Sequence, residues 1–226
     1  MDLEKNAILY IKDIFQYDFS GHDFWHSVRV YKNAMSIAQF EVCNQRVIML
    51  GSLLHDVDDK KLFKTDNYNN ARNFMENNDI DEITLLKVID AIKTVSYSEN
   101  KSIIPKTIEA KIIQDADRLD AIGAIGIARA FAFGGNIGRG IYDPEYQKHN
   151  EYKYTTLDHF NEKLFRLKSM MNTETAKKWL SIETVSCIIL LMNFMKNGME
   201  IYRHSVQLVN TNLHTILYGA PGGSTF

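Results

Sequence analysis

Apolar residues recur at helical spacing along almost the whole of this 226-residue chain. Two of the clearest stripes are Leu3, Ala7, Ile11 and Ile14, followed by Val28, Tyr31, Met35 and Ala38. A period of about 3.6 residues is typical of amphipathic helices that bury one face. Because hydrophobic residues make up 45% of the chain, it can bury one sizeable core. The sequence therefore predicts an all-α protein.

Capping residues predict where several helices begin. Asn44 precedes an apolar run at 47–54, Asp79 or Asp81 precedes another apolar stripe, and Thr155 and Thr173 precede two more. Such side chains accept hydrogen bonds from the first-turn N–H groups of a helix. Between these segments we expect a helix that runs from beyond Pro105 through Asp117 to Gly126. The glycine-rich stretch 133–155 has no helical stripe. A polar loop of this length is typically either a cover for a site or disordered, and we favour the cover.

The run 47–54 ends in the pair His55-Asp56. Neighbouring side chains on a helix point about 100° apart, so both reach one ion only if the ion lies at the helix end. His26 and Asp117 lie in similar helical contexts. Two imidazoles and two carboxylates from separate helices can enclose one divalent cation. The dipeptide alone is equally consistent with a buried structural pair, so the prediction depends on the wider set.

Three segments around these residues closely resemble the HD-domain metal-dependent phosphohydrolases. They are residues 21–30, 54–59 and 114–126, with a weaker likeness at 159–164. The resemblance implies a single HD-type helical bundle with additional C-terminal helices. We expect this domain to span residues 1–200, with 201–226 as a C-terminal extension of unassigned structure.

The resemblance implies four metal ligands, which are His26, His55, Asp56 and Asp117. A cation held there would polarise a phosphoryl oxygen and lower the pKa of a bound water. Nitrogen and oxygen ligands together suit Mn²⁺, Fe²⁺, Co²⁺, Ni²⁺ or Zn²⁺ better than an all-oxygen magnesium site, although substrate phosphates could make Mg²⁺ workable. Manganese is our first choice.

Two acidic residues follow the His-Asp pair and are candidates for catalysis. Asp59 lies one helical turn from His55, and Asp58 is nearer. Either could orient or deprotonate the attacking water, and position in the motif favours Asp59. The structural alternative is a solvent-exposed acidic turn after a helix.

Three cationic residues near the ligands are candidates for phosphate or carboxylate contacts. Lys61 resembles the lysine that closes the family's acidic segment, and we interpret it as a phosphate contact. Arg29 could pair with a carboxylate or reach a phosphate. We expect Arg118 to have the structural role.

Three further residues are weaker candidates for substrate contacts. His159 and Lys163 lie on one helical stripe, and such a charged stripe is usually a solvent-exposed face. The resemblance instead suggests that these two residues contact substrate phosphates. His22 lies four residues before His26 and could share its helical face. We interpret His22 as a pocket residue, with helix capping as the alternative.

The resemblance implies a nucleotide substrate for a stand-alone bacterial hydrolase. We expect hydrolysis of nucleoside or deoxynucleoside triphosphates to monophosphate and pyrophosphate. The alternatives are a nucleoside monophosphate phosphatase, a phosphodiesterase, or a non-enzymatic ligand-sensing or interaction module stabilised by a metal.

The charge and composition of the chain indicate which binding partners and which cellular compartment to expect. A net charge of -2, with no basic stripe, disfavours polynucleotide binding. No secretory signal or membrane-length apolar run is present, and Cys43 and Cys187 read as free thiols in a reducing compartment. We therefore expect a cytoplasmic protein that acts on a small phosphorylated molecule, and a homodimer is compatible with the sequence.

Overall fold

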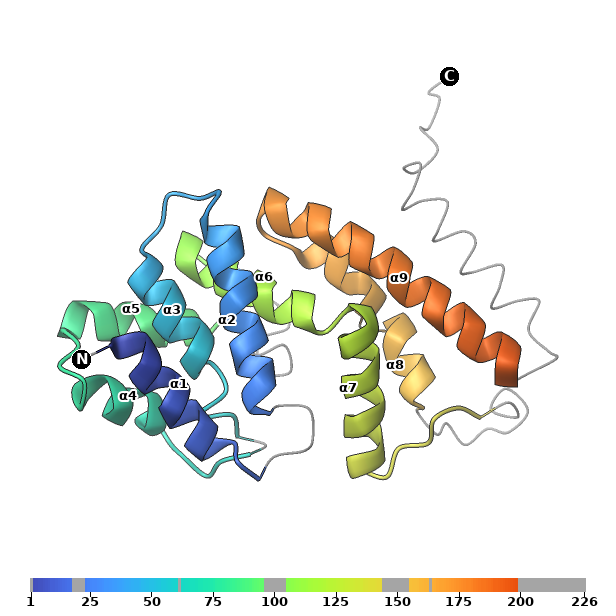
Figure 1. The fold of residues 1–226 in the computed structure, drawn as a ribbon, viewed down its shortest axis with the longest axis horizontal. Helices are drawn as coiled ribbons and strands as arrows, with labels where there is room; N and C mark the ends of the chain where they lie inside the picture. The colour runs from blue at the N-terminus through green and yellow to red at the C-terminus, as the bar shows by residue number, and fades with distance from the viewer. Residues whose placement is uncertain are drawn as a thin grey trace, which may run out of the picture.

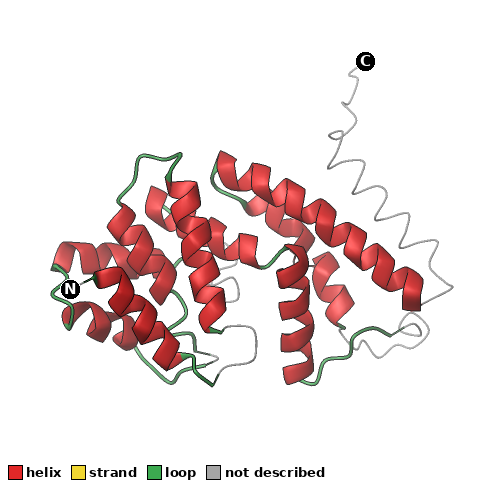
Figure 2. Cartoon of the chain, viewed as in Figure 1, coloured by secondary structure: helices red, strands yellow, loops and turns green. Residues whose placement is uncertain are grey.

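The computed structural model describes residues 2–17, 23–60, 62–95, 105–143, 155–162 and 164–198. Within these ranges the chain forms helices and loops without a strand, as the periodicity predicts (Figure 2). The elements in order are α1 (Leu3–Ile14), α2 (Phe24–Ala38), α3 (Gln45–Leu54), α4 (Asn69–Glu76), α5 (Glu82–Ile92), α6 (Ile108–Asp120), α7 (Gly123–Asn136), α8 (Thr156–Glu162), the 3-10 helix η2 (Leu164–Met170) and α9 (Glu174–Gly198).

Helix α2 packs against both α3 and α6, and these three helices form the centre of the fold. Helices α1 and α5 both pack against α3, and α4 packs on α5. Helices α7 and α8, η2 and α9 form the other end of the molecule, next to the C-terminal end of α6 (Figure 1). The central helices therefore connect the N-terminal and C-terminal groups of helices.

Two hydrophobic clusters fill these two ends. One joins α1, α3, α4 and α5 through fully buried side chains such as Ile11, Leu54 and Met75. The other joins α2 and α6 to the C-terminal helices through Ile113 and Leu180. Because α2 and α3 contribute to both clusters, residues at their ends are held by close packing from two sides.

The predicted caps are confirmed where the structure describes them. Asn44 Oδ1 accepts hydrogen bonds from the N–H groups of Arg46 and Val47 at the start of α3. Asp81, rather than Asp79, caps α5. The hydroxyls of Thr155 and Thr173 accept from first-turn N–H groups of α8 and α9. These helices begin where the sequence predicts.

The prediction of one helix through Asp117 to Gly126 is wrong. Helix α6 ends at Asp120, and α7 begins at Gly123 after a turn. Gly123 has φ 77°, in the left-handed region that favours glycine. A Cβ on Gly126 would lie 2.3 Å from the backbone of Ala121, so any side chain there would clash with this turn. The glycines allow a sharp change of direction immediately after the ligand-bearing helix.

The predicted loop at 133–155 is shorter than expected at its start, because α7 continues to Asn136. Residues 137–143 are irregular, and residues 144–154 lie outside the described ranges. The interpretation of this stretch as a cover for a site stays a prediction.

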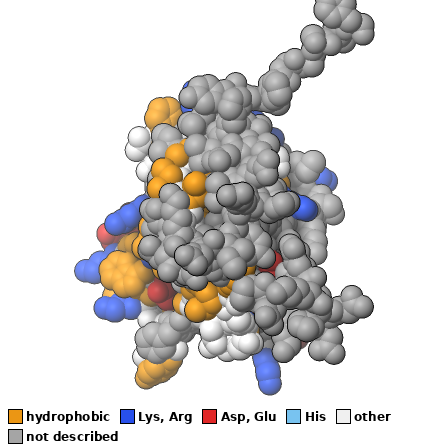
Figure 3. All heavy atoms as spheres, turned by 90° about the vertical axis from the view of Figure 1, so that its right-hand side faces the viewer, with side chains coloured by type: hydrophobic (Ala, Val, Ile, Leu, Met, Phe, Trp, Pro, Cys, Tyr) orange, Lys and Arg blue, Asp and Glu red, His pale blue; other side chains and the backbone are white. Residues whose placement is uncertain are grey.

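The surface, the helix lengths and the cysteines can be compared with the expectations from the sequence. In Figure 3, the described part of the surface mixes hydrophobic side chains with Lys and Arg. No described helix combines the length and apolar character needed to cross a membrane. Neither Cys43 nor Cys187 forms a disulfide among the described residues, and Cys187 is buried.

Candidate metal centre

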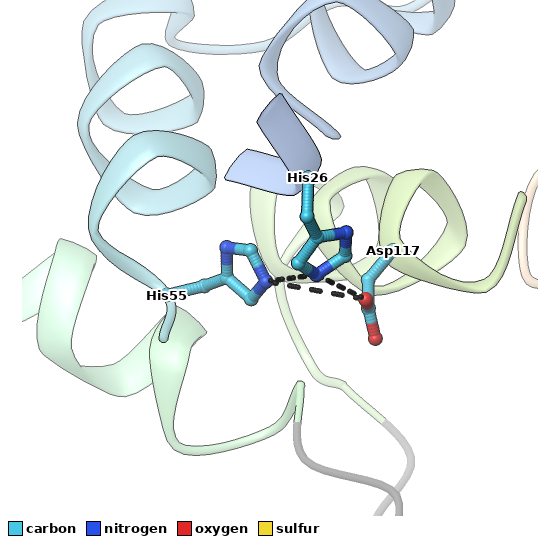
Figure 4. Close-up of side chains that lie close together, drawn as sticks. All are labelled: His26, His55 and Asp117. Carbon is cyan, nitrogen blue, oxygen red and sulfur yellow. Dashed lines mark hydrogen bonds and ion pairs between the residues drawn. The ribbon is translucent and has the colours of Figure 1, made fainter. Parts of the chain in front are cut away.

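His26 is the third residue of α2 and is completely buried. Asp23 caps the helix by accepting a hydrogen bond of 2.7 Å from the N–H group of His26. The cap fixes the first turn of α2, and this turn directs the imidazole toward His55 and Asp117 (Figure 4).

His55 is the C-cap of α3 and lies where the apolar run ends. Its Nδ1 lies 2.8 Å from the carbonyl oxygen of Ser52, which fixes the ring so that Nε2 faces His26. Asp56 follows directly, and its carboxylate approaches both imidazoles. This arrangement agrees with the sequence argument that an ion shared by the pair must lie at the helix end.

Asp117 brings the third helix to the same point. It lies in the last turn of α6, and its Oδ1 is 3.4 Å from His26 Nε2 and 3.9 Å from His55 Nε2. Asp56 Oδ2 is 3.3 Å from His26 Nε2 and 3.2 Å from His55 Nε2. The two Nε2 atoms are themselves 3.2 Å apart. All four predicted ligands therefore converge.

These separations fit a shared divalent cation. Ligand atoms bound at about 2.1 Å lie roughly 3.0 Å apart when they are at right angles and about 4.2 Å apart when they are opposite. The separations measured here fall between those limits. Of the four, His26, His55 and Asp117 also form a cluster in which single donor atoms lie within 4.8 Å of one another. Two neutral imidazole nitrogens and two carboxylates suit a transition metal.

The site's charge also favours a cation. Burial lowers the pKa of His55, but the nearby carboxylates of Asp56 and Asp117 outweigh burial and raise that pKa to about 9. A buried imidazole that holds a proton so strongly lies in a strongly negative environment. A divalent cation would occupy that environment in place of the proton.

A buried ion-pair network supports His26 from behind. Asp120 Oδ2 lies 2.8 Å from His26 Nδ1, so the metal-facing Nε2 is left to act as a ligand. Arg29 binds both oxygens of Asp120, at 2.6 and 3.1 Å, and Arg129 binds Oδ2 at 2.7 Å. Although burial acts to raise the pKa of Asp120, the hydrogen bonds from His26 and Arg29 lower it to about 2. Asp120 therefore stays ionised.

Sequence reasoning did not identify Asp120 or Arg129. Asp120 lies three residues after Asp117 on α6, and Arg29 lies three residues after His26 on α2. Helical spacing places each pair on one face, and this spacing was the available signal. Arg29 could pair with a carboxylate or reach a phosphate, and in the structure it pairs with the carboxylate of Asp120.

The acidic residues after Asp56 have different surroundings. Both oxygens of Asp58 accept backbone hydrogen bonds, from the N–H groups of Asn70 at 3.0 Å and Ala71 at 2.9 Å, and they thereby cap α4. The backbone N–H of Asp59 donates to Asp56 O at 3.0 Å. Its side chain lines a pocket that also includes His55 and Asp56. Asp59 thus lies beside the ligands.

The remaining predicted contacts are more dispersed. Arg118 donates to the carbonyl oxygen of Met170, and its expected pairing with a carboxylate stays a prediction. His159 is half-buried on α8, which packs chiefly on η2 and α7. His22, Lys61 and Lys163 lie outside the described residues.

Comparison with known proteins accounts for this constellation. The HD domain family model matches residues 24–122, a span that contains all four predicted ligands. YpgQ of Bacillus subtilis (strain 168) is 37% identical over 180 residues, which are 75% of this chain and 80% of YpgQ. The chain belongs to the HD domain family. As an HD-superfamily hydrolase, it is a metal-dependent phosphohydrolase.

Solved structures extend the HD likeness over most of the chain. An HD-superfamily hydrolase from Bacillus thuringiensis is 36% identical, with a TM-score of 0.68 over 86% of this chain and 96% of its own. Bacillus subtilis YpgQ in complex with ADP is 32% identical, with a TM-score of 0.69 over 84% of this chain and 97% of its own. The similarity therefore includes helices beyond the profile match.

Proposed function

We propose that this HD-domain protein hydrolyses nucleoside or deoxynucleoside triphosphates to the nucleoside monophosphate and pyrophosphate. The observation that carries the proposal is the convergence of His26, His55, Asp56 and Asp117 on one point. Support for a nucleotide comes from YpgQ, whose structure was solved with ADP. We propose Mn²⁺ as the native cation, since mixed nitrogen and oxygen ligands suit it.

A bound divalent cation would supply Lewis acidity for a phosphoryl oxygen and would make water more acidic. The protein prepares the site for it. His26 and His55 each use Nδ1 in a hydrogen bond, at 2.8 Å in both cases, so each presents Nε2 with fixed orientation. Asp56 and Asp117 provide the two negative charges that balance a divalent ion.

We assign the general base to Asp59 rather than Asp58. Both Asp58 oxygens already accept N–H groups of α4, and moving them would uncap that helix. Asp59 lines the pocket beside His55 and Asp56, within the turn that follows the ligands. From there its carboxylate would take a proton from the attacking water as the bond to the α-phosphorus forms and the bond from that phosphorus to the departing pyrophosphate breaks.

Other parts of the proposal rest on the sequence. Lys61, His159, Lys163 and His22 remain proposed substrate contacts, and Arg29 would act mainly through Asp120. We propose residues 1–200 as the catalytic domain and 201–226 as an extension. Cytoplasmic localisation and a homodimer also stay predictions.

The test is a nucleotide panel with purified protein and Mn²⁺. We expect nucleoside triphosphates to yield the monophosphate and pyrophosphate in equal amounts, detected by ion-exchange chromatography. Orthophosphate release from monophosphates, with triphosphates intact, would replace this proposal with a nucleotidase. Cleavage of cyclic or oligonucleotide substrates alone would replace it with a phosphodiesterase.

A further inference from the structure

A pocket of about 310 Å³ opens beside the metal ligands. His55, Asp56 and Asp59 form one part of its wall. Another part comes from residues 65–68, which we call the 65–68 loop, in the connection between α3 and α4. The volume lies at the lower limit for small-molecule sites. A group attached to a phosphate bound at the metal could enter it.

The charge of the described wall limits what that group can be. Four carboxylates, those of Asp56, Asp58, Asp59 and Asp66, line the pocket with one cationic side chain, Lys60. Away from the cation, this wall repels phosphate. Carboxylates instead accept hydrogen bonds from neutral donors. The pocket therefore suits a neutral group that carries hydroxyls.

Thr65 supplies a second, independent observation. Its hydroxyl oxygen is buried, and it has no hydrogen-bond partner among the described residues. Native proteins pair most buried hydroxyls with protein groups or water, because an unpaired one is costly. Thr65 lies in the pocket wall, and rotation about its χ1 would turn this hydroxyl from its buried position toward a ligand hydroxyl in the pocket.

The backbone of the 65–68 loop is also unusual. Asn67 and Tyr68 have φ 54° and 58°, in the left-handed region that non-glycine residues rarely adopt. Arg72 holds this conformation by donating from Nε to the carbonyl oxygen of Asn67 at 3.0 Å. Such strain persists where the surroundings enforce it, often at ligand sites. Here it presents Thr65, Asp66 and Tyr68 together along one pocket wall.

We propose that this pocket is the sugar subsite of the enzyme and that it recognises the ribose hydroxyls of a ribonucleotide. The inference rests on the proposed nucleotide phosphohydrolase activity and deepens it. The Thr65 hydroxyl pairs with the ribose 2′-hydroxyl, and Asp66 accepts from the neighbouring hydroxyl. A 2′-deoxynucleotide leaves the Thr65 hydroxyl unpaired, so the enzyme prefers ribonucleotides.

The test compares kcat/KM for ATP and dATP in the 226-residue, Mn²⁺-loaded protein. We expect the wild type to favour ATP by about tenfold, since a missing hydrogen bond of about 1.4 kcal/mol corresponds to that factor. Thr65→Val, which removes the hydroxyl at similar volume, lowers the ATP:dATP ratio about tenfold. Thr65→Ser, which keeps a hydroxyl, restores the ratio. The exposed neighbour gives a control, Lys64→Ala, with the wild-type ratio.

Two outcomes overturn the inference and differ from each other. If the wild type hydrolyses both triphosphates at equal kcat/KM, or if Thr65→Val keeps the wild-type ratio, the sugar subsite is wrong and the proposed activity stands. If neither triphosphate is hydrolysed, the proposed function fails and the subsite fails with it. Thermal unfolding of Thr65→Val shows whether the variant is folded, and we expect a midpoint no lower than that of the wild type.

Discussion

Asp120 Oδ2 lies 2.8 Å from His26 Nδ1, on the side of the ring opposite the metal-facing nitrogen. Arg29 and Arg129 hold the same carboxylate in place. The predicted metal ligand His26 is thus oriented by an acidic residue that itself lies outside the set of predicted ligands. Residues of this kind contribute to metal affinity without touching the ion.

Asp120→Asn tests this support. We expect Mn²⁺ affinity and kcat/KM to fall by about 10- to 100-fold, because the amide no longer fixes the His26 ring as a charged acceptor does. Titration calorimetry measures the affinity. Asp90→Asn changes an exposed carboxylate on α5 and serves as the control, with unchanged metal binding. Equal affinity in Asp120→Asn and wild type would refute the role.

Metal binding is expected to release a proton near neutral pH. The pKa of His55 is raised to about 9 in the absence of a cation, chiefly because the effect of Asp56 and Asp117 exceeds that of burial. Since Mn²⁺ must displace this proton, its apparent affinity rises by up to about one decade per pH unit from pH ~6.5 to 9. Calorimetry in buffers of different ionisation enthalpy counts the proton. Affinity that is constant from pH 7 to 9 would contradict the prediction.

The raised pKa of His55 also makes the stability of the metal-free protein fall as pH rises, whereas metal affinity increases with pH. A pKa raised above its unfolded value adds stability that is fully present below about pH 6.5 and is lost as pH rises through about 9. Metal-free protein is therefore expected to unfold at lower urea concentration at pH 9.5 than at pH 6.5. The metal-loaded protein lacks this loss, which provides the control.

Asp117→Ala separates a catalytic metal from a structural one. We expect turnover to fall by more than about 100-fold while the helical circular dichroism and the cooperative unfolding transition remain, because Asp117 is partly exposed at the end of α6. Chelation with EDTA is expected to give the same loss, which added Mn²⁺ reverses. Unfolding of the variant and of the chelated protein would instead favour a metal that only stabilises an interaction module.

Substitutions of Asp58 and Asp59 are expected to affect different properties, stability for Asp58 and turnover for Asp59. Asp58→Ala removes the cap of α4 and is expected to lower the free energy of unfolding by about 1–2 kcal/mol. Asp59→Asn is expected to lower kcat by about 10²- to 10⁴-fold, as loss of a general base does, with stability unchanged. Urea unfolding and steady-state kinetics on both variants give the comparison. The reverse pattern would exchange their roles.

Asp115 links the ligand helix to α9. Its buried carboxylate accepts the N–H groups of Asn172 and Thr173, the Asn172 side-chain amide and the Thr173 hydroxyl. Burial raises the pKa of Asp115 in spite of these hydrogen bonds. Asp115→Ala is expected to cost about 3 kcal/mol in unfolding free energy, because two backbone N–H groups lose their acceptor. Asp115→Asn keeps one acceptor oxygen and is expected to lose less.

The convergence of the four predicted ligands could be anticipated because their sequence signals are local. His26, His55, Asp56 and Asp117 lie on or directly after apolar helical stripes in recognisable motifs, so the chain order alone places them. Helical spacing and caps likewise predict the all-α fold. The same information places the starts of α3, α5, α8 and α9.

What the sequence did not reveal depends on distant partners. Helix α4 has few apolar residues, its N-cap Tyr68 makes no side-chain cap hydrogen bond, and Asp58 supplies the acceptor from 12 residues upstream. The network around Asp120 likewise depends on how α2 packs against α6. The break after Asp120 is not predicted, because local sequence does not distinguish a glycine with positive φ, such as Gly123, from a glycine packed within a helix.

Helices α3 and α6 both end at the candidate metal centre, with His55 as the C-cap of one and Asp117 in the last turn of the other. The carbonyl end of a helix carries a partial negative charge, of about half an elementary charge. The N-terminal end of α2, which carries His26, has the opposite partial charge, so two negative ends face one positive end. The backbone balance is therefore negative, and it adds to the attraction of the carboxylates for positive charge. Exchanging the ligand side chains therefore leaves part of the cation preference intact, because that part is set by where the helices stop.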